Sequence, residues 1–277
     1  MAGMPHLVQV QEKYKAQGLI VFASHCQQVE QGKVVALCRS KKVNYTVVDG
    51  ARLAGDDTNG IPHAWLFDAS GKVVMEGHVE QFNAKIEELL AKEPHWITRG
   101  KKLESKEAKG ITDGLKAQKP FGWALEQCEA ILKKGGESKA HEEATFLKEQ
   151  LTAEGDRRLA EAKAMEEENA FRAEGIYKEI ELVFKKGEAG TKAAERAKEL
   201  KKDKAFQDEV KVGKMVAQVE ELCASMKAVN GTYNPDNPAN RDAAAQVTAI
   251  AKQLKSKQYA ESKTAKKCLD GLKDYGL

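Results

Sequence analysis

The stretch from residue 60 to residue 77 decides how the front of the chain folds. It reads Gly-Ile-Pro-His-Ala-Trp-Leu-Phe-Asp-Ala-Ser-Gly-Lys-Val-Val-Met-Glu-Gly. Two apolar runs, residues 64–67 and 73–75, flank an Asp-x-x-Gly turn, and this order predicts an antiparallel hairpin. Trp65 and Phe67 alternate with their neighbours as strand residues do, so we expect both to be core or half-buried.

Outward from the hairpin, helix and strand signals alternate from residue 4 to about residue 92. Gly18 is expected to end the first helix, because glycine readily takes the left-handed conformation of a helix C-cap. The expected elements are a helix around residues 7–14, a strand at 19–23, a helix at 28–41, a strand at 45–48 and, after the hairpin, a helix at 80–91. Such alternation indicates an α/β domain, which we place at residues 1–92.

Beyond Pro94 the strand signals disappear, and Ala, Glu, Lys and Leu, which favour helix, dominate. We expect a linker at residues 93–120 and an all-helical domain at residues 121–277. The expected helices span residues 121–134, 137–186, 191–202, 204–229, 239–257 and 262–274. Trp96, Phe121 and Trp123 stand near the junction, where we expect them to pack the two halves together.

Two segments of the helical half resemble each other faintly, around residues 184–197 and 259–268. Each has an aromatic residue, a short polar turn and small residues three apart. The pattern is similar to the second half of a tetratricopeptide-type helical hairpin, but a clean 34-residue period is absent. A helical-repeat scaffold and an irregular helical bundle both remain open.

Charge and cysteine content exclude several classes of function. The 45 basic and 42 acidic residues nearly cancel and are interleaved, so we expect no nucleic-acid partner. Five cysteines lie far apart without a CxxC or zinc-ligand spacing, so we expect no metal and no cofactor. Apolar runs such as residues 18–23 are far shorter than the roughly 20 residues of a membrane span, and residues 1–30 show no export signal.

The front block resembles the redoxin branch of the thioredoxin superfamily, the TlpA-like thiol-disulfide oxidoreductases, over residues 3–92. The resemblance rests on Met4-Pro5-His6-Leu7, on Gly60-Ile61-Pro62-His63-Ala64 and on Phe67-Asp-Ala-Ser-Gly-Lys72, in this order and at these spacings. It implies an α/β thioredoxin-like fold. It also implies that the Ile61-Pro62 bond is a cis peptide in a loop beside the active site.

One departure from the family pattern affects both fold and chemistry. The family places a central strand and a WCxxC motif immediately before the position of Met4, where this chain has Met1-Ala2-Gly3. By the family's sheet order, the absent strand would lie between the strands expected at residues 19–23 and 64–67. We therefore expect either an N-terminally truncated chain or a degenerate natural protein, and no redox turnover, because disulfide exchange needs a low-pKa thiolate and a second thiol.

Four residues are candidates for a site. The resemblance implies that Ile61, Pro62 and His63 contact an extended partner peptide, although the residues themselves favour a surface role for His63. Cys26 is the candidate catalytic thiol, because it ends the first expected strand, at the edge where ligands gather in open α/β sheets. Adjacent strand residues point to opposite faces, however, so His25 is poorly placed to deprotonate Cys26, and an inert thiol is the alternative.

Three functions remain open from the sequence. The first is a thioredoxin-like relative of the thiol-disulfide oxidoreductases that exchanges disulfides with a protein partner when intact and lacks turnover in this chain. The second is a non-catalytic scaffold that docks a protein or peptide. The third is a peroxidase dependent on Cys26. The resemblance implies a periplasmic or exported protein if a signal lies upstream, and the chain as written implies a cytoplasmic one.

Overall fold

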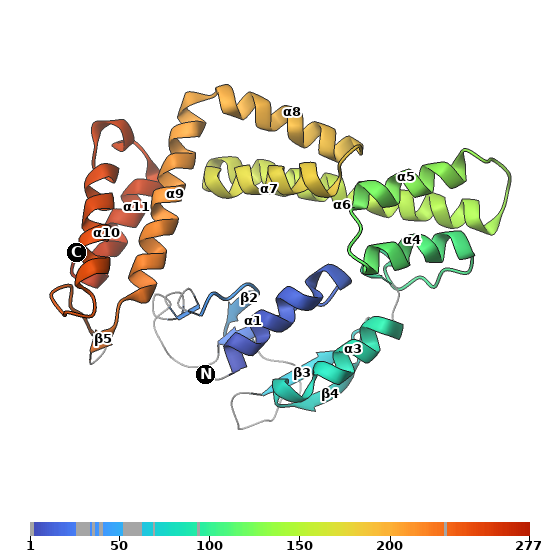
Figure 1. The fold of residues 1–277 in the computed structure, drawn as a ribbon, viewed down its shortest axis with the longest axis horizontal. Coiled ribbons are helices and arrows are strands. Elements are labelled where there is room, and N and C mark those ends of the chain that lie inside the picture. Colours follow the sequence, from blue (N-terminus) through green and yellow to red (C-terminus); the bar gives the residue numbers. More distant parts are fainter. Residues whose placement is uncertain are drawn as a thin grey trace. The chain divides into compact units, whose positions relative to one another are not determined.

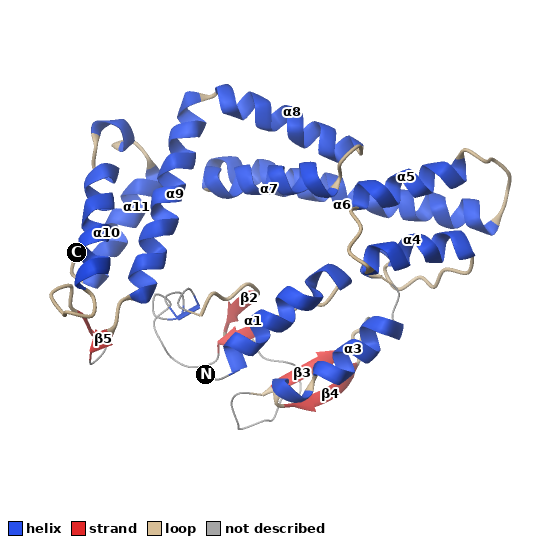
Figure 2. Ribbon diagram, in the orientation of Figure 1, coloured by secondary structure: helices blue, strands red, loops and turns tan. Residues whose placement is uncertain are grey.

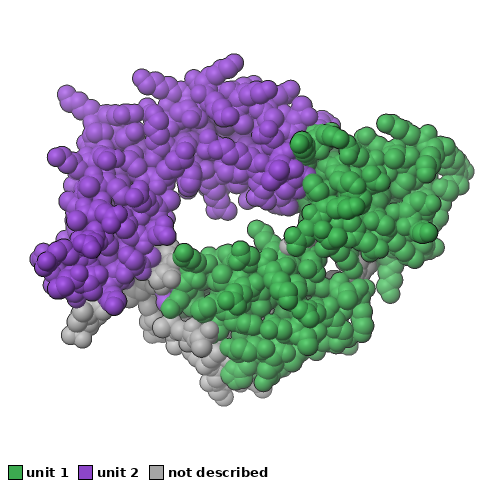
Figure 3. All heavy atoms as spheres, viewed as in Figure 1, with its two compact units in different colours: residues 1–34, 41–154, 184–187 green, residues 35–40, 155–183, 188–277 purple. Residues whose placement is uncertain are grey.

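Helices dominate the computed structural model, and strands are few and short (Figures 1 and 2). The structure describes residues 3–25, 34, 37–38, 41–51, 63–68, 70–92, 95–229 and 232–277. The chain forms two compact units (Figure 3). The first comprises residues 1–34, 41–154 and 184–187, and the second comprises residues 35–40, 155–183 and 188–277.

The front block begins with helix α1 (Gly3–Tyr14), which continues as a short 3₁₀ helix (Lys15–Gln17). Gly18 ends it as expected, with a φ of 107° and its N–H donating to the Lys15 carbonyl at 3.1 Å. Strand β1 (Phe22–His25) begins three residues later than the sequence pattern predicts. The N–H of Val21 explains part of this shift, because it donates to Oε1 of Gln11 on α1 at 3.1 Å.

Strand β1 pairs with β2 (Thr46–Asp49) in parallel, so that Phe22 lies opposite Thr46 and Ser24 opposite Val48. Strand β3 (Ala64–Phe67) pairs with β4 (Val73–Gly77) in antiparallel, which confirms the predicted hairpin. The turn between them is held by Asp68, whose Oδ1 accepts from the N–H of Ser70 at 2.9 Å and of Lys72 at 3.0 Å.

The two faces of the hairpin differ in burial. Leu66 is buried on the inner face, whereas Phe67 is 42% exposed and Val73 is 39% exposed on the outer face. The expectation of a core or half-buried Phe67 is therefore wrong, while Trp65 is half-buried as expected. Period-two alternation separates the faces of a strand, but it does not say whether the second face is covered.

The front core forms where α1 meets the hairpin and the closing helix. After a short 3₁₀ turn (Val79–Gln81), helix α3 (Asn83–Lys92) packs its apolar side toward α1. The buried members of this cluster are Val10, Tyr14, Leu66, Phe82 and Ile86. The segment just before β2 is tied to α1 by Asn44, whose Nδ2 donates to the Val8 carbonyl at 3.1 Å.

Within the described residues, the four strands of the front block form two separate two-stranded sheets. Strand β1 pairs with β2 alone and β3 pairs with β4 alone. The sequence analysis places an absent strand between β1 and β3. In the described part of the chain, β1 and β3 do not pair directly with each other.

The helical half contains more helices than the sequence pattern predicts. They are α4 (Lys106–Lys116), α5 (Phe121–Leu132), α6 (Lys139–Glu168), α7 (Ala170–Val183), α8 (Glu188–Lys202), α9 (Lys204–Ser225), α10 (Arg241–Leu254) and α11 (Lys263–Gly271), followed by a 3₁₀ turn (Leu272–Tyr275). A small hairpin, β5 (Ala228–Val229) and β6 (Thr232–Tyr233), separates α9 from α10. No described helix has the length and apolar character needed to cross a membrane.

A single asparagine divides the helix expected at residues 137–186 into α6 and α7, so that expectation is wrong. The Oδ1 of Asn169 accepts from the N–H of Arg172 at 3.0 Å, as an N-cap does. Its carbonyl accepts from Ala173 at 2.9 Å, while its own N–H donates to Met165 at 2.8 Å. One residue thus ends the first helix and begins the second.

Helix α4 lies inside residues 93–120, where the sequence analysis expects a linker. Ser105 caps it, its Oγ accepting from the N–H of Ala108 at 3.3 Å. Ala108, Ile111 and Leu115 recur at helical spacing on its buried side. The residues expected to be a connector therefore include a packed helix.

Aromatic residues pack where the front block meets the first helices. The ring of Trp96, in a 3₁₀ turn (Trp96–Thr98), lies 5.8 Å from the ring of Phe121, which lies 5.3 Å from Phe184. A Cβ at Gly18 would lie 2.8 Å from Trp96, so this packing needs glycine there. Trp123 instead contacts α4, close to Gly114.

Candidate functional site

The structure describes one of the four predicted site residues. Cys26, Ile61 and Pro62 lie outside the described residues, as does the predicted cis peptide bond. His63 stands directly before β3, and its Nε2 lies 3.1 Å from Oε1 of Glu76 on the paired strand β4. Its ring meets the edge of Trp65 with the centroids 4.6 Å apart.

These contacts place His63 on the outer face of the hairpin, with 22% of its side chain exposed. Glu76 and Trp65 fix the ring from two sides, so its position is set by the hairpin itself. A histidine held by a carboxylate can move a proton, but such chemistry needs a reacting group within hydrogen-bond reach. The geometry thus accounts for His63 as an ordered surface residue that could contact a partner.

The thiols of the described residues are dispersed, and burial suppresses the reactivity of two of them. Cys38, Cys128, Cys223 and Cys268 are all present as thiols. Burial raises the pKa of Cys128 to about 12, and burial also raises the pKa of Cys38. A thiol with a raised pKa stays protonated near neutral pH and is a poor nucleophile. Among the described residues, no cluster of three or more His, Cys, Asp or Glu side chains is arranged to hold a metal ion.

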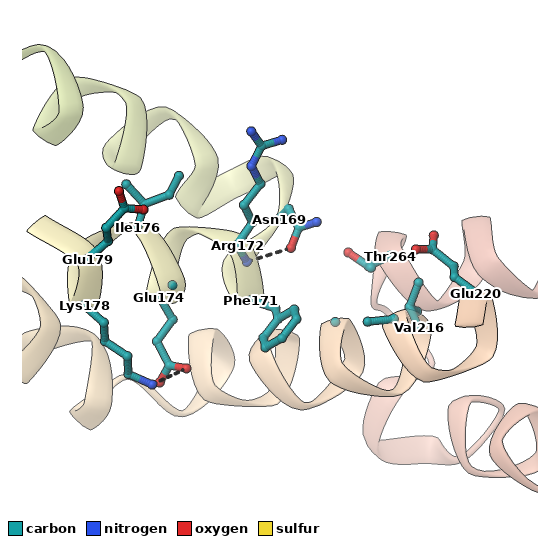
Figure 4. A pocket seen from close by; sticks show the side chains of 13 residues that line it. Asn169, Phe171, Arg172, Glu174, Ile176, Lys178, Glu179, Val216, Glu220 and Thr264 are labelled. Atoms are coloured by element: carbon teal, nitrogen blue, oxygen red, sulfur yellow. Dashed lines mark hydrogen bonds and ion pairs between the residues drawn. The ribbon is translucent and has the colours of Figure 1, made fainter. Parts of the chain in front are cut away.

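The second unit contains a groove that the sequence analysis did not predict. It has a volume of about 630 Å³ and lies beside the first half of α7, the middle of α9 and the start of α11 (Figure 4). Small residues, Gly175 on α7 with Gly213 and Ala217 on α9, line it. A Cβ on Gly175 would meet nothing within 4 Å, so this position leaves open space in the groove.

Phe171 forms the apolar wall of the groove and also fixes its width. Its side chain points from α7 toward α9, whereas Arg172 points away from α9 (Figure 4). A Cβ placed on Gly213 would lie 2.4 Å from the Cβ of Phe171, so the two helices approach this closely only because residue 213 is glycine. Val216 extends the apolar lining along α9.

Charged residues of both signs surround this apolar wall. Glu174 pairs with Lys178 at 2.9 Å along α7, and Glu179 pairs with Arg158 of α6 at 3.2 Å. Glu220 and Thr264 line the groove at the end nearest α11. An apolar centre with a polar rim of mixed charge is the composition of protein–protein contact surfaces.

A part-buried ionic cluster holds α7 in place. Glu166 on α6 accepts from Arg196 of α8 through two hydrogen bonds, at 3.0 Å from Nε and 2.6 Å from Nη2. The hydroxyl of Tyr177 on α7 donates to the same carboxylate at 2.6 Å. These hydrogen bonds and the positive charge of Arg196 hold the pKa of Glu166 below its usual range, although burial opposes the shift. Three helices are thereby joined through one carboxylate.

Comparison with known proteins identifies no relative. No family model matches the sequence, no curated protein is significantly similar to it, and no solved structure is significantly similar to the fold.

Proposed function

We propose that this chain is a thioredoxin-like protein that binds a protein or peptide partner and does not turn over disulfides. The observation that carries the proposal is the groove of the second unit, with its small-residue lining, its apolar wall at Phe171 and its rim of charged residues. It is a surface suited to contact and contains no thiol.

The thioredoxin-like part of the proposal is supported by the order and pairing of the front elements. A helix, a strand and a parallel strand precede an antiparallel hairpin and a closing helix within residues 3–92. The resemblance implies this order. The hairpin carries the Phe-Asp-x-x-Gly-Lys turn on which the resemblance partly rests.

The absence of turnover is supported by the thiols. The sequence has no CxxC motif. The thiol of Cys128 is fully buried, and the pKa values of Cys38 and Cys128 are both raised. Disulfide exchange requires the opposite, a lowered pKa with a second thiol within reach.

Site-specific photo-crosslinking tests the binding role. A benzophenone amino acid at Ile176, which lines the groove, is compared with one at Leu182, which lies on the same helix outside the groove and is 71% exposed. In an extract of the source cells, we expect a discrete protein adduct from position 176 and none from position 182.

Matched substitutions establish whether the adduct depends on the groove. Gly175 in the groove and Gly110 on α4 are both exposed helical glycines, and a Cβ at either would meet nothing within 4 Å. Gly175→Trp should fill the groove and abolish the adduct, whereas Gly110→Trp should leave it. Equal crosslinking at positions 176 and 182, or an adduct that survives Gly175→Trp, would overturn the binding role of the groove.

A further inference from the structure

Positive charge is concentrated where α10 ends and α11 begins. Residues 252–267 contain six lysines and one acidic residue, Glu261, so their net charge is +5, whereas that of the whole chain is +3. All six lysine side chains are exposed, and they are Lys252, Lys255, Lys257, Lys263, Lys266 and Lys267. The near balance of charge along the whole chain therefore conceals a local excess, and we call these six residues the lysine surface.

Little of this charge is neutralised within the chain. Lys266 pairs with Glu261 at 3.2 Å, while the other five lysines form no ion pair with any residue that the structure describes. On α9, Asp208 and Glu209 accept hydrogen bonds from the segment at 3.0 Å. Asp208 also pairs with Lys211 at 3.0 Å, so its charge is already compensated. The lysine surface therefore keeps an excess of positive charge facing solvent.

Helix α11 gains no stability from the lysines at its start. Ser262 caps the helix, and no acidic residue stands in its first turn. Lys263 begins the helix, and Lys266 and Lys267 follow within the next turn. A helix N-terminus carries partial positive charge, so cations there are unfavourable, whereas the lysines at the end of α10 are favourably placed by the same rule. Residues that oppose the local preference of their helix are expected at functional positions.

The lysine surface adjoins the groove of the second unit. Thr264, which lines the groove on α11, stands in the sequence between Lys263 and Lys267. Residues three apart on a helix are neighbours, so Lys267 lies beside Thr264 on the helix surface. Glu220 of α9 lines the same end of the groove (Figure 4), and the two lysines outnumber it.

We propose that the lysine surface binds an acidic segment, rich in Asp and Glu, of the partner that occupies the groove. Unlike charges attract across a contact surface, and they fix its orientation and speed its formation. The inference rests on the proposed function, because it adds the charge of the partner to the binding role of the groove.

The composition of residues 252–267 favours a protein segment over a membrane or a nucleic acid. These residues include no Arg, Phe or Trp. Their one aromatic residue, Tyr259, packs against the buried cluster of α9, α10 and α11. Helices that bind membrane surfaces insert large apolar side chains, and single-stranded nucleic acids stack on aromatic rings. The lysine surface offers neither feature, whereas acidic side chains need only its charge.

Fluorescence anisotropy of a labelled oligoglutamate peptide tests the proposal on the full chain. We expect binding that weakens as salt is added, and that the double variant Lys263→Gln with Lys267→Gln weakens by about three- to tenfold. The matched control is Lys106→Gln with Lys109→Gln on α4, which removes the same charge from the start of another serine-capped helix. The control should change the affinity far less, and circular dichroism verifies that both double variants fold.

Two other polyanions, measured in the same way, test the class of partner. We expect an oligothymidylate and vesicles containing phosphatidylserine to bind more weakly than the peptide. Absence of peptide binding, equal effects of the two double variants, or tighter binding of either other polyanion would overturn the proposal. Oligoglutamate has no apolar side chain to fill the groove, so these results are independent of the crosslinking at position 176 that tests the groove itself.

Discussion

Glycine allows unusually close packing at two positions of the helical half. A Cβ on Gly122 of α5 would lie 2.1 Å from the carbonyl oxygen of Lys185, in the turn after α7, and a Cβ on Gly213 of α9 would lie 2.4 Å from the Cβ of Phe171 on α7. Real side chains do not approach this closely, so any larger residue must displace the neighbouring segment. Neither glycine has a positive φ, so the requirement is for space and not for backbone conformation.

We predict that Gly213→Ala lowers the free energy of unfolding by about 1–3 kcal/mol, because overpacking forces backbone shifts. Gly175→Ala is the matched control, because a Cβ at this position would meet nothing within 4 Å. It should raise stability by about 0.5–1 kcal/mol through helix propensity alone. Urea denaturation measures both, and equal effects of the two substitutions would contradict the close approach of α7 and α9.

Glu143 is a fully buried carboxylate that organises the start of α4. It accepts from the N–H of Glu104 at 2.7 Å, the N–H of Ser105 at 2.9 Å and the hydroxyl of Ser105 at 2.6 Å. Burial by itself would raise the pKa of Glu143, but these hydrogen bonds and the charge of Lys139 outweigh it and lower the pKa. The unfolded chain therefore binds this proton more readily than the folded one.

The pKa of Glu143 predicts a stability contribution that depends on pH. Because the folded pKa is depressed, the contribution is present above the ordinary glutamate pKa and is lost as the pH falls toward the folded value. Glu143→Gln should lower the free energy of unfolding by about 1.5–3 kcal/mol at neutral pH, the value of hydrogen bonds to a charged group. The difference from the unchanged chain should shrink in acid, and a difference constant with pH would rule out the charged carboxylate as its cause.

At the scale of helices, the cluster around Glu166 has an internal control. Glu166 and Glu199 both bind Arg196, but the side chain of Glu166 is 13% exposed and that of Glu199 is 67% exposed. Exposed ion pairs contribute little because water and salt screen them, whereas a shielded carboxylate with three hydrogen bonds contributes more.

We predict that Glu166→Gln lowers the free energy of unfolding by about 1–3 kcal/mol. Glu199→Gln should have a far smaller effect, although it removes an ion pair to the same guanidinium. Thermal unfolding of the two variants provides the comparison. Equal losses would show that α6, α7 and α8 are not held by the Glu166 carboxylate.

Elements that are determined by residues close together in the sequence could be predicted. The hairpin at residues 64–77 was predictable because its Asp-x-x-Gly turn and the apolar runs on both sides are adjacent in the sequence. The break at Asn169 was not, because one asparagine among strong helix formers shows no cap until its side chain meets the backbone of Arg172. Helix α4 had a readable signal in Ser105 and in the spacing of Ala108, Ile111 and Leu115, although the sequence analysis placed a linker there.

At the scale of the whole molecule, the candidate site could not be read from the sequence. The groove depends on where α7, α9 and α11 meet, and Gly175 and Gly213 lie 38 positions apart in the chain. Of the residues that the resemblance implies, His63 is an ordered residue of the hairpin face. Cys26, Ile61 and Pro62 lie outside the described residues, and their roles stay predictions.

We propose that this chain binds a partner and does not exchange disulfides. The most direct test follows the reduction of insulin disulfides by dithiothreitol in the presence of the full chain, with Cys26→Ser and Cys38→Ser variants as controls. We predict that the chain leaves the rate at that of dithiothreitol alone, and that both variants behave identically. A faster reduction that either substitution abolishes would contradict the claim, because it would show a reactive thiol where we infer none.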